Sequence, residues 1–253
     1  MEVHAHTHTS DSDSHRGRKK WTHYFWEFLM LFLAVFCGFL AENQRERYVE
    51  HKREKQYVKS FLEDLRSDLE QLDSLVKQRV KRKRDIDSLS IFLSSSDPDV
   101  YAKQIYYLSR PLTIAYQFFR NERTIQQLKN GGNLRLIRKQ DVSDAIMLYD
   151  HHVRWTDLVA DREKAFILEY VKRIEELFDT RVFDRMRTGT LVYKMPEEQE
   201  VHLLKNDKLS IQLFLNKIHF LNSVNDYHLM VYQQLLDLAK QAKTLIEREY
   251  SLK

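Results

Sequence analysis

The chain has 253 residues, of which only five are Gly and three are Pro. Tight turns depend on Gly and Pro, so this composition argues against a β-sandwich, a barrel or an α/β enzyme with many loops. The 41 basic and 37 acidic residues leave a net charge of +4, too slight to predict nucleic-acid binding. A single Cys excludes a disulfide framework and a Cys-based zinc site. We therefore predict a protein built from long helices.

Residues 1–20 form a polar, low-complexity tail that we expect to be disordered. His4, His6 and His8 alternate within it, and imidazole nitrogens bind Zn, Ni or Cu. No carboxylate or thiolate completes a fixed coordination geometry there. The pattern therefore favours weak or adventitious metal binding over a metal-sensing tail, and we expect no cofactor.

Residues 21–41 form an apolar stretch that begins with aromatic residues, among them Trp21 and Trp26. Such residues are typical of the membrane–water interface. As a helix, the stretch spans about 31 Å, which matches the hydrocarbon core of a bilayer. A cleaved signal peptide is the alternative, but Phe39 stands where a cleavage site before residue 42 needs a small side chain. We therefore expect an uncleaved transmembrane helix.

The two faces of this predicted span differ in side-chain size. Five Phe residues share one face, and Ala34 and Gly38 form a small-xxx-small pair on the other, which lets two helix backbones approach closely. We expect this second face to bind another copy or a partner helix, with a simple anchor as the alternative. The predicted association face consists of Glu27, Ala34, Gly38 and Ala41.

Glu27 is the one acidic residue within the predicted span. A charged group at membrane depth is a candidate functional group by default. Three roles stay open for it: a polar contact between helices, snorkelling to the interface, and a proton or ion site.

Residues 42–56 are almost purely charged and predict a helical stalk. Acidic side chains recur at every fourth position, and basic ones form a second stripe about 100° away. In an oligomer, the acidic stripe of one copy would face the basic stripe of the next; a solvated stalk is the favoured interpretation. The acidic stripe is Glu42, Glu46, Glu50 and Glu54, and the basic stripe is Arg47, His51, Lys55 and Lys59.

Residues 57–253 are predicted to form a helical bundle domain. The fold class is thus all-α: a single N-terminal transmembrane helix followed by an antiparallel bundle of about four long helices. A coiled-coil heptad over 58–76 continues the stalk. Further helices are expected over 109–129, ended by Gly131 and Gly132, over 139–186, and from 196–210 to about Tyr250.

A basic cluster over 77–84 contains six Lys and Arg residues. A solvated helix face is the favoured interpretation, followed by a docking patch for an acidic partner and, last, by nucleic acid. His228 lies on the apolar face of the last predicted helix, which favours a core histidine over a metal ligand.

The sequence contains no His-Glu-x-x-His, P-loop or Gly-x-Gly-x-x-Gly motif. The run Asp150-His151-His152 suggests catalysis, but successive helix residues point about 100° apart and do not converge. We therefore expect no catalytic residues and a protein that is not an enzyme.

Three stretches carry a family resemblance: KWTHYFWEFLMLFLAVFCGFLAENQRE (20–46), REKQYVKSFLEDLRSDLEQL (53–72) and TIQQLKNGGNLRLI (124–137). Together they resemble a family of uncharacterised single-pass inner-membrane proteins of Bacteroidota. The resemblance implies the inner membrane of a Gram-negative bacterium. It supplies no catalytic residue, substrate or cofactor.

The function predicted from the sequence is that of a membrane-anchored, non-catalytic assembly or scaffold protein. Its partners would be the lipid bilayer and either further copies of itself or a larger membrane complex. Lys and Arg are nearly balanced on the two sides of the span, but a short basic tail favours a cytoplasmic N-terminus and a periplasmic bundle. The alternatives are an oligomeric ion channel or ion-coupled subunit that uses Glu27, and an extracytoplasmic, sensor-like bundle that binds a ligand.

Overall fold

A computed structural model describes residues 16–197 and 200–252, with side chains from Trp21 onward. The chain divides into two compact units, one up to Arg53 and one from Glu54 on. Helix α1 (Arg16–Leu93) contributes to both units. The predicted metal-binding residues His4, His6 and His8 lie outside the described residues.

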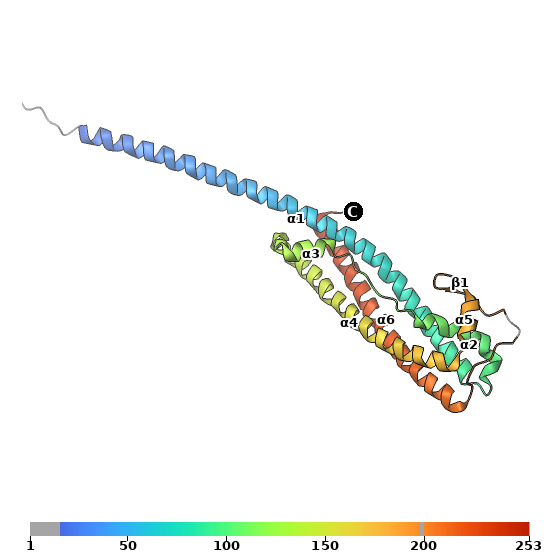
Figure 1. Cartoon of the computed structure of the whole chain (residues 1–253). Helices are drawn as coiled ribbons and strands as arrows, with labels where there is room; N and C mark the ends of the chain where they lie inside the picture. Colours follow the sequence, from blue (N-terminus) through green and yellow to red (C-terminus); the bar gives the residue numbers. More distant parts are fainter. Residues whose placement is uncertain (1–15, 198–199, 253) are drawn as a thin grey trace, which may run out of the picture. The chain divides into compact units, whose positions relative to one another are not determined.

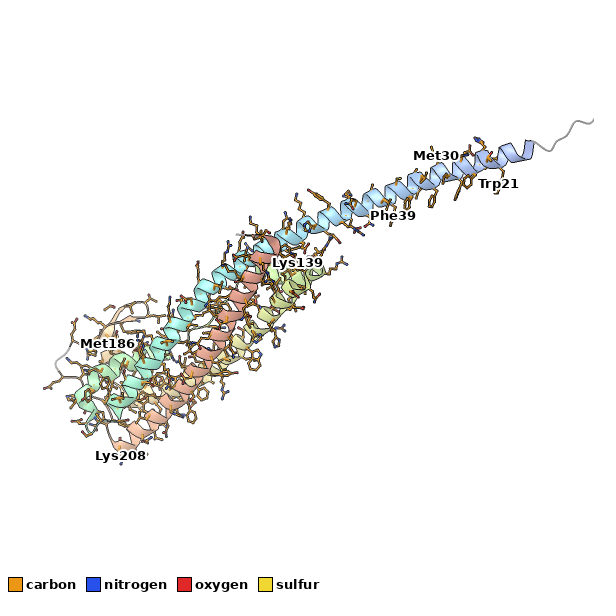
Figure 2. The ribbon with its side chains drawn as sticks, turned by 180° about the vertical axis from the view of Figure 1, so that it is seen from behind. Trp21, Met30, Phe39, Lys139, Met186 and Lys208 are labelled. Atoms are coloured by element: carbon orange, nitrogen blue, oxygen red, sulfur yellow. The ribbon has the colours of Figure 1, made fainter. Side chains whose placement is uncertain are left out.

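The apolar stretch of the first unit is part of one helix whose two faces carry different side chains, and almost every side chain is exposed. Figure 2 shows Trp21, Met30 and Phe39 standing out from it. The rings of Phe28, Phe32 and Phe36 stack one turn apart, with centroids 6.3 and 5.9 Å from each other. The predicted Phe face is therefore present. By length and composition, the described residues hold one helix that is apolar enough to cross a membrane, through an 18-residue window of which nothing is buried.

Three long helices dominate the described part of the second unit: the part of α1 from Glu54 on, α4 (Gln140–Leu177) and α6 (Lys208–Tyr250) (Figure 1). Helix α6 runs antiparallel to α1, because Tyr250 bonds to Glu54 while Asn222 bonds to Asp87. It also runs antiparallel to α4, so α1 and α4 are parallel to each other. The prediction of a mainly helical unit is therefore confirmed, but its number of about four long helices is wrong, because the described residues of this unit hold three.

A long connection makes the parallel pair possible by carrying the chain back along the bundle. It begins with short turns and ends beside the Glu54 end of α1. Its elements are η2 (Pro98–Tyr101), α2 (Ala102–Ser109), η3 (Arg110–Thr113), α3 (Arg123–Asn130) and η4 (Asn133–Leu136). Between η3 and α3, residues 114–122 belong to no helix or strand and begin with an extended Ile114; we call them the return segment (Figure 1). The predicted helix over 109–129 is therefore wrong for its first half.

The helix expected over 139–186 is broken at Phe178, whose backbone is extended. Asp179 then caps a new helix, α5 (Thr180–Met186), by accepting a hydrogen bond from the backbone N–H of Arg181. A two-stranded hairpin of β1 (Arg187–Gly189) and β2 (Val192–Tyr193) follows. The last helix matches its prediction and starts with Asp207 as its cap.

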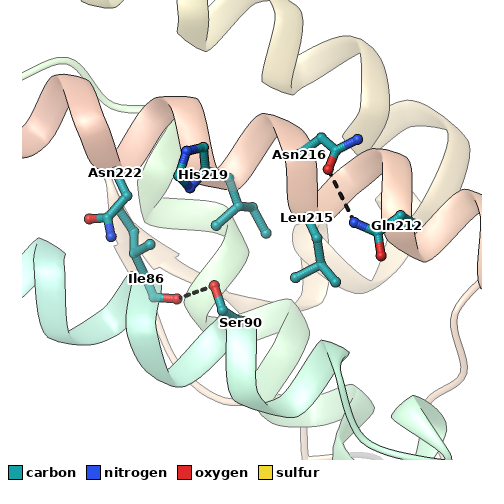
Figure 3. A pocket seen from close by; sticks show the side chains of 8 residues that line it. Ile86, Ser90, Gln212, Leu215, Asn216, His219 and Asn222 are labelled. Atoms are coloured by element: carbon teal, nitrogen blue, oxygen red, sulfur yellow. Dashed lines mark hydrogen bonds between the residues drawn. The ribbon is translucent and has the colours of Figure 1, made fainter.

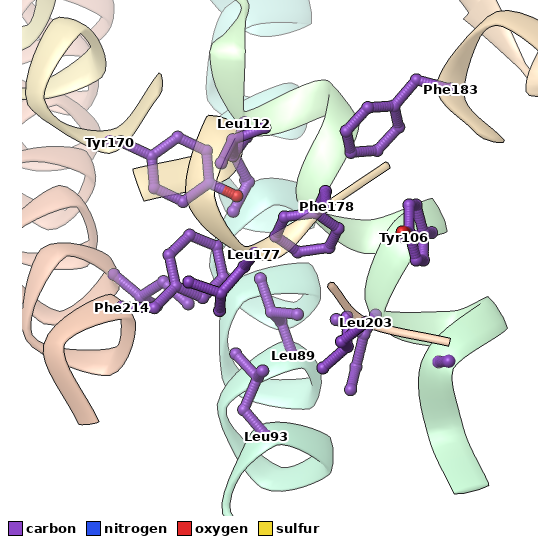
Figure 4. Close-up of a cluster of buried hydrophobic side chains, with 14 of the residues drawn as sticks. Leu89, Leu93, Tyr106, Leu112, Tyr170, Leu177, Phe178, Phe183, Leu203 and Phe214 are labelled. Atoms are coloured by element: carbon purple, nitrogen blue, oxygen red, sulfur yellow. The ribbon is translucent and has the colours of Figure 1, made fainter. Parts of the chain in front are cut away.

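Two hydrophobic clusters fill the second unit. One lies at the Leu93 end, where Phe178 and Phe214 meet edge to face among leucine side chains (Figure 4). The other lies at the Glu54 end and contains Val58, Leu65 and Leu72, which confirms that the predicted heptad packs inward. The two clusters are separated along α1 by the stretch between Leu75 and Ile86, and the site described below occupies that stretch.

The turn after α3 contains a glycine in a left-handed backbone conformation, and the need for glycine there can be tested by substitution. Gly132 has φ +61°, and a Cβ there would meet no atom within 4 Å, so only the backbone opposes a side chain. We expect Gly132→Ala to lower the free energy of unfolding by about 1 kcal/mol. The matched control is Gly189→Ala, whose Cβ would make ordinary contacts with Val192. Chemical unfolding followed by circular dichroism measures both, and equal losses would contradict the expectation.

Candidate functional site

The predicted association face of the membrane segment is exposed in full. Ala34, Gly38 and Ala41 are exposed, and a Cβ added at Gly38 would meet no atom within 4 Å. The face therefore has the open, small-residue surface that a second helix needs for close packing. The single thiol of the chain, Cys37, is exposed beside it.

Glu27 has a neighbour that sequence reasoning missed. His23 Nε2 lies 3.1 Å from Glu27 Oε1, one helical turn earlier, and both side chains are more than half exposed. The signal was the i,i+4 spacing of an imidazole and a carboxylate. The pair gives Glu27 a local partner, so its role as an isolated proton or ion site gains no support from this geometry.

The predicted charge stripes are exposed at most positions but not at Glu54. This carboxylate is only 2% exposed, and its Oε1 accepts hydrogen bonds from the backbone N–H of Arg138 and from the hydroxyl of Tyr250. Glu54 is therefore committed to the bundle, and its place in a stripe that faces another chain is wrong. Glu42 instead pairs with Arg45 on its own helix, and those hydrogen bonds lower the pKa of Glu42.

The basic cluster over 77–84 is divided between the surface and the core. Arg79 and Arg82 are 0% and 4% exposed, whereas Lys77, Lys81 and Arg84 face outward. The prediction of a solvated face is therefore wrong for these two arginines. Their positions continue the buried stripe of α1, so the side chains enter the bundle between its two hydrophobic clusters.

Glu163 of α4 receives both arginines. Arg79 donates from its two terminal nitrogens to the two carboxylate oxygens at 2.5 and 2.8 Å, and Arg82 Nη2 lies 3.8 Å from the same group. Burial acts to raise the pKa of Glu163, but the hydrogen bonds and charge of Arg79 outweigh it, and the pKa lies below its usual value. Glu163 is therefore a buried anion between two cations.

The arginines also bind the backbone of the return segment and of the turn before it. Arg79 Nη2 donates to the carbonyl oxygen of Tyr116 at 2.5 Å. Arg82 donates to the carbonyl oxygens of Leu112 and Ile114 at 2.8 and 2.9 Å. The guanidinium groups thus pair the backbone acceptors of residues 112, 114 and 116, and the carbonyl oxygen of Tyr116 also accepts a hydrogen bond from the hydroxyl of Tyr232.

Three more side chains of α1 hold the rest of the return segment. The amide of Gln71 accepts from the N–H of Phe119 at 2.6 Å and donates to its C=O at 3.0 Å. Asp68 accepts from the N–H of Asn121, and Asp64 accepts from the N–H of Thr124 in the first turn of α3. Asp64 thus caps α3 from another helix, since Glu122 makes no side-chain cap.

We call the polar groups between the two hydrophobic clusters the buried layer. Helix α6 adds a histidine, an amide and a phenol to it. His228 is fully buried, and its Nε2 lies 3.2 Å from the carbonyl oxygen of Val159, so the ring carries its proton there. Asn225 donates to the backbone of Arg79, and Tyr232 donates to that of Tyr116. The prediction of a core histidine is confirmed. Burial and the charge of Arg79 lower the pKa of His228 to about 4.

Asp150, which invited a catalytic interpretation, is part of a separate charge cluster. It is buried and lies 2.5 Å from Arg120, 2.9 Å from Lys129 and 3.3 Å from Arg154. His151 next to it points outward. The cluster ties α4 to the return segment and to α3, and it presents no nucleophile with a base. Within 16–197 and 200–252, no group of three or more His, Cys, Asp or Glu side chains is placed to hold a metal ion.

A surface pocket of about 340 Å³ between α1 and α6 is the candidate ligand site shown in Figure 3. Its walls are neutral and partly polar: Gln212 donates to Asn216, and Ser90 donates to the backbone of Ile86. His219 is its one titratable side chain. The pocket offers amide and hydroxyl contacts but no charged group to orient a substrate, so it has no catalytic constellation.

In comparisons with protein-family models, curated proteins and solved structures, nothing matched this chain. The resemblance to the Bacteroidota membrane family therefore stays a prediction.

The buried layer predicts a large effect of removing its anion. Glu163→Gln leaves Arg79 and Arg82 buried without a full counter-charge, so we expect the free energy of unfolding to fall by about 3–5 kcal/mol. Glu175→Gln, an exposed carboxylate on the same helix, is the control and should change it by less than about 0.5 kcal/mol. Thermal unfolding of both full-length variants tests this; similar melting temperatures would refute it.

The lowered pKa of His228 predicts that the free energy of unfolding depends on pH in a definite direction. Its pKa in the folded state is about 4 against an ordinary 6.5, so between these values the unfolded chain binds a proton that the folded chain does not. The free energy of unfolding then falls as the pH falls from 6.5 to 4, by up to about 1.4 kcal/mol per unit. We expect His228→Gln to flatten the profile in this window, and His219→Gln, at an exposed position of α6, to leave it unchanged.

Most groups that face His228 leave that window clear. Arg79 and Arg82 keep their charge throughout, and Tyr232 titrates far above it; the pKa of Glu163 is lowered from 4.5, so this carboxyl adds its own loss of stability at the acid end of the window. Parallel wild-type and His228→Gln profiles would show that the imidazole is not the titrating group.

Proposed function

We propose that this chain is a single-pass membrane protein whose helical bundle assembles with itself or with a larger membrane complex. The proposal rests on one observation, which is that the two units differ in the exposure of their apolar side chains. The apolar segment 21–41 is exposed along its length, whereas the second unit closes its apolar side chains into two buried clusters. Exposed Phe, Leu and Val in such number need an apolar partner, and a bilayer is the partner that fits the length of the segment.

The association face supports the assembly part of the proposal. Small side chains at Ala34 and Gly38 leave room for a second helix, and stacked Phe rings on the opposite face suit lipid chains. The buried layer of the second unit is closed by arginine, glutamate and backbone groups, which favours a structural role for it over a catalytic one. The bundle would lie in the periplasm of a bacterium, with the N-terminus in the cytoplasm and the inner membrane between them.

A membrane assay of the full-length chain tests the anchor. Membranes are washed at alkaline pH, and the mass of the protein in the pellet is measured. We expect the protein to stay in the pellet at its full mass of 30.6 kDa. Release into the supernatant, or a mass that shows cleavage after the apolar segment, would identify a signal sequence instead.

The assembly is tested by bulky side chains on the association face. We expect Ala34→Leu combined with Gly38→Leu to lower the fraction of the protein whose native mass in mild detergent exceeds that of one 30.6 kDa chain. Phe32→Leu combined with Phe36→Leu changes the opposite face and should leave this fraction unchanged. Equal fractions for the first pair of substitutions and the wild type would contradict the role of this face.

A further inference from the structure

The groove between α4 and α6 carries an exposed aromatic surface outside the membrane segment. Trp155 is 47%, Phe220 52% and Met230 43% exposed. Phe166 stacks on Phe220 with ring centroids 6.2 Å apart, and Tyr227 lies on the same stripe as Phe220, seven residues on. We call these five residues the seam. An apolar surface of this kind on a soluble domain marks an interaction site.

The aromatic residues of the seam face away from α1, and Met230, one turn after Asp226, lies at the edge of the seam. Asp226 bonds to Lys83, and Asn222 bonds to Asp87, which fixes the side of α6 that α1 covers. Tyr227 follows Asp226 by one residue and is therefore turned by about 100° from it. The aromatic residues of the seam thus lie on a side of the α4–α6 pair that no described element covers.

The seam contains a pocket large enough to accept a side chain. It holds about 270 Å³ and is walled by Trp155, Tyr227 and Met230 together with His152 and Val231. On the neighbouring turn of α4, Leu158 projects with 68% of its surface exposed. In a two-fold symmetric interface, the leucine that protrudes from each copy enters the apolar pocket of the other copy.

Contacts between α4 and α6 show which residues lie at the same height. Glu169 bonds to Lys217, and His228 lies against the backbone of Val159. Counting along both helices from these contacts places Leu158 within one residue of the level of Met230. Glu169 lies within two residues, about 3 Å, of the level of His219.

We propose that a second copy of this chain covers the seam, related by a two-fold axis parallel to α4 and α6. Helix α4 of one copy then lies beside α6 of the other, at the same heights. Leu158 meets Met230 of the second copy, and the carboxylate of Glu169 faces His219 of the second copy. By the same count, His151 faces Asp237 of the second copy, so apolar side chains meet in one layer and an imidazole meets a carboxylate in each of two others.

The direction of the axis follows from the membrane anchor, so this inference rests on the proposed function and deepens it. An axis along the helices keeps Glu54 of both copies at the same end, which two chains anchored in one bilayer require. An antiparallel arrangement of the two bundles would place these ends apart. The seam is then a second association surface, separate from Ala34 and Gly38.

Cross-linking between single-cysteine chains tests the inference in native membranes. Cys37→Ser removes the only thiol of the chain, so new ones report single positions. One tagged chain carries Leu158→Cys, and a differently tagged chain carries Met230→Cys. We expect oxidation of co-expressed chains to give at least a fivefold higher yield of the mixed disulfide than the control pair of Ile91→Cys with Met230→Cys. Ile91 is 70% exposed, but it lies on α1.

The outcomes separate the two proposals. A mixed disulfide at 158–230, reduced at least fivefold when Trp155→Glu is added to both chains with helix content unchanged, supports the seam. Equal yields at 158–230 and 91–230 in a sample whose native mass exceeds one chain overturn the seam and leave assembly through the membrane face standing. A native mass of one chain, with no mixed disulfide, overturns both.

Discussion

The return segment imposes the constraint around which the second unit is organised. Its backbone belongs to no helix or strand, yet it crosses a helical domain in which buried N–H and C=O groups must be paired. Side chains of α1 supply the partners: Asp64, Asp68 and Gln71 at one end, and Arg79 and Arg82 at the other. Burying two arginines then requires an anion, and Glu163 of α4 provides it. One irregular segment thus accounts for most of the charged groups within the core; Glu54, which accepts hydrogen bonds from Arg138 and Tyr250, is an exception.

This layer also determines how the helices align. The bidentate contact from Arg79 to Glu163 favours one height of α1 against α4, because sliding α1 by a turn would break it together with the hydrogen bonds from both arginines to the backbone carbonyl groups of residues 112, 114 and 116. Leucines and phenylalanines on either side of the layer tolerate such shifts better. The polar groups therefore specify the register, while the two hydrophobic clusters supply the greater part of the burial.

Much of the architecture could be predicted from periodicity alone. The heptad of α1, the extent of α6, the core position of His228 and the Gly131-Gly132 helix end all follow from local patterns. The return segment does not, because a stretch free of Gly after Pro111 looks helical and only contacts with α1 make it irregular. The burial of Arg79 had a signal that charge counting obscured: Leu72, Leu75, Arg79, Arg82, Ile86 and Leu89 continue a single 3–4 spacing.

The positions of these contacts along the chain bear on how the protein is made. Arg82 reaches carbonyl groups about 30 residues later, and Asp64 caps α3 60 residues later, whereas the bond between Glu54 and Tyr250 spans 196 residues. Contacts between near neighbours in sequence form faster than distant ones, and a nascent chain emerges from its N-terminus. Helix α1 and the return segment therefore meet on the ribosome before α6 has been synthesised. Until Glu163 emerges, backbone carbonyl groups are the hydrogen-bond acceptors available to the two arginines. Their positive charge is neutralised only once α4 has been synthesised.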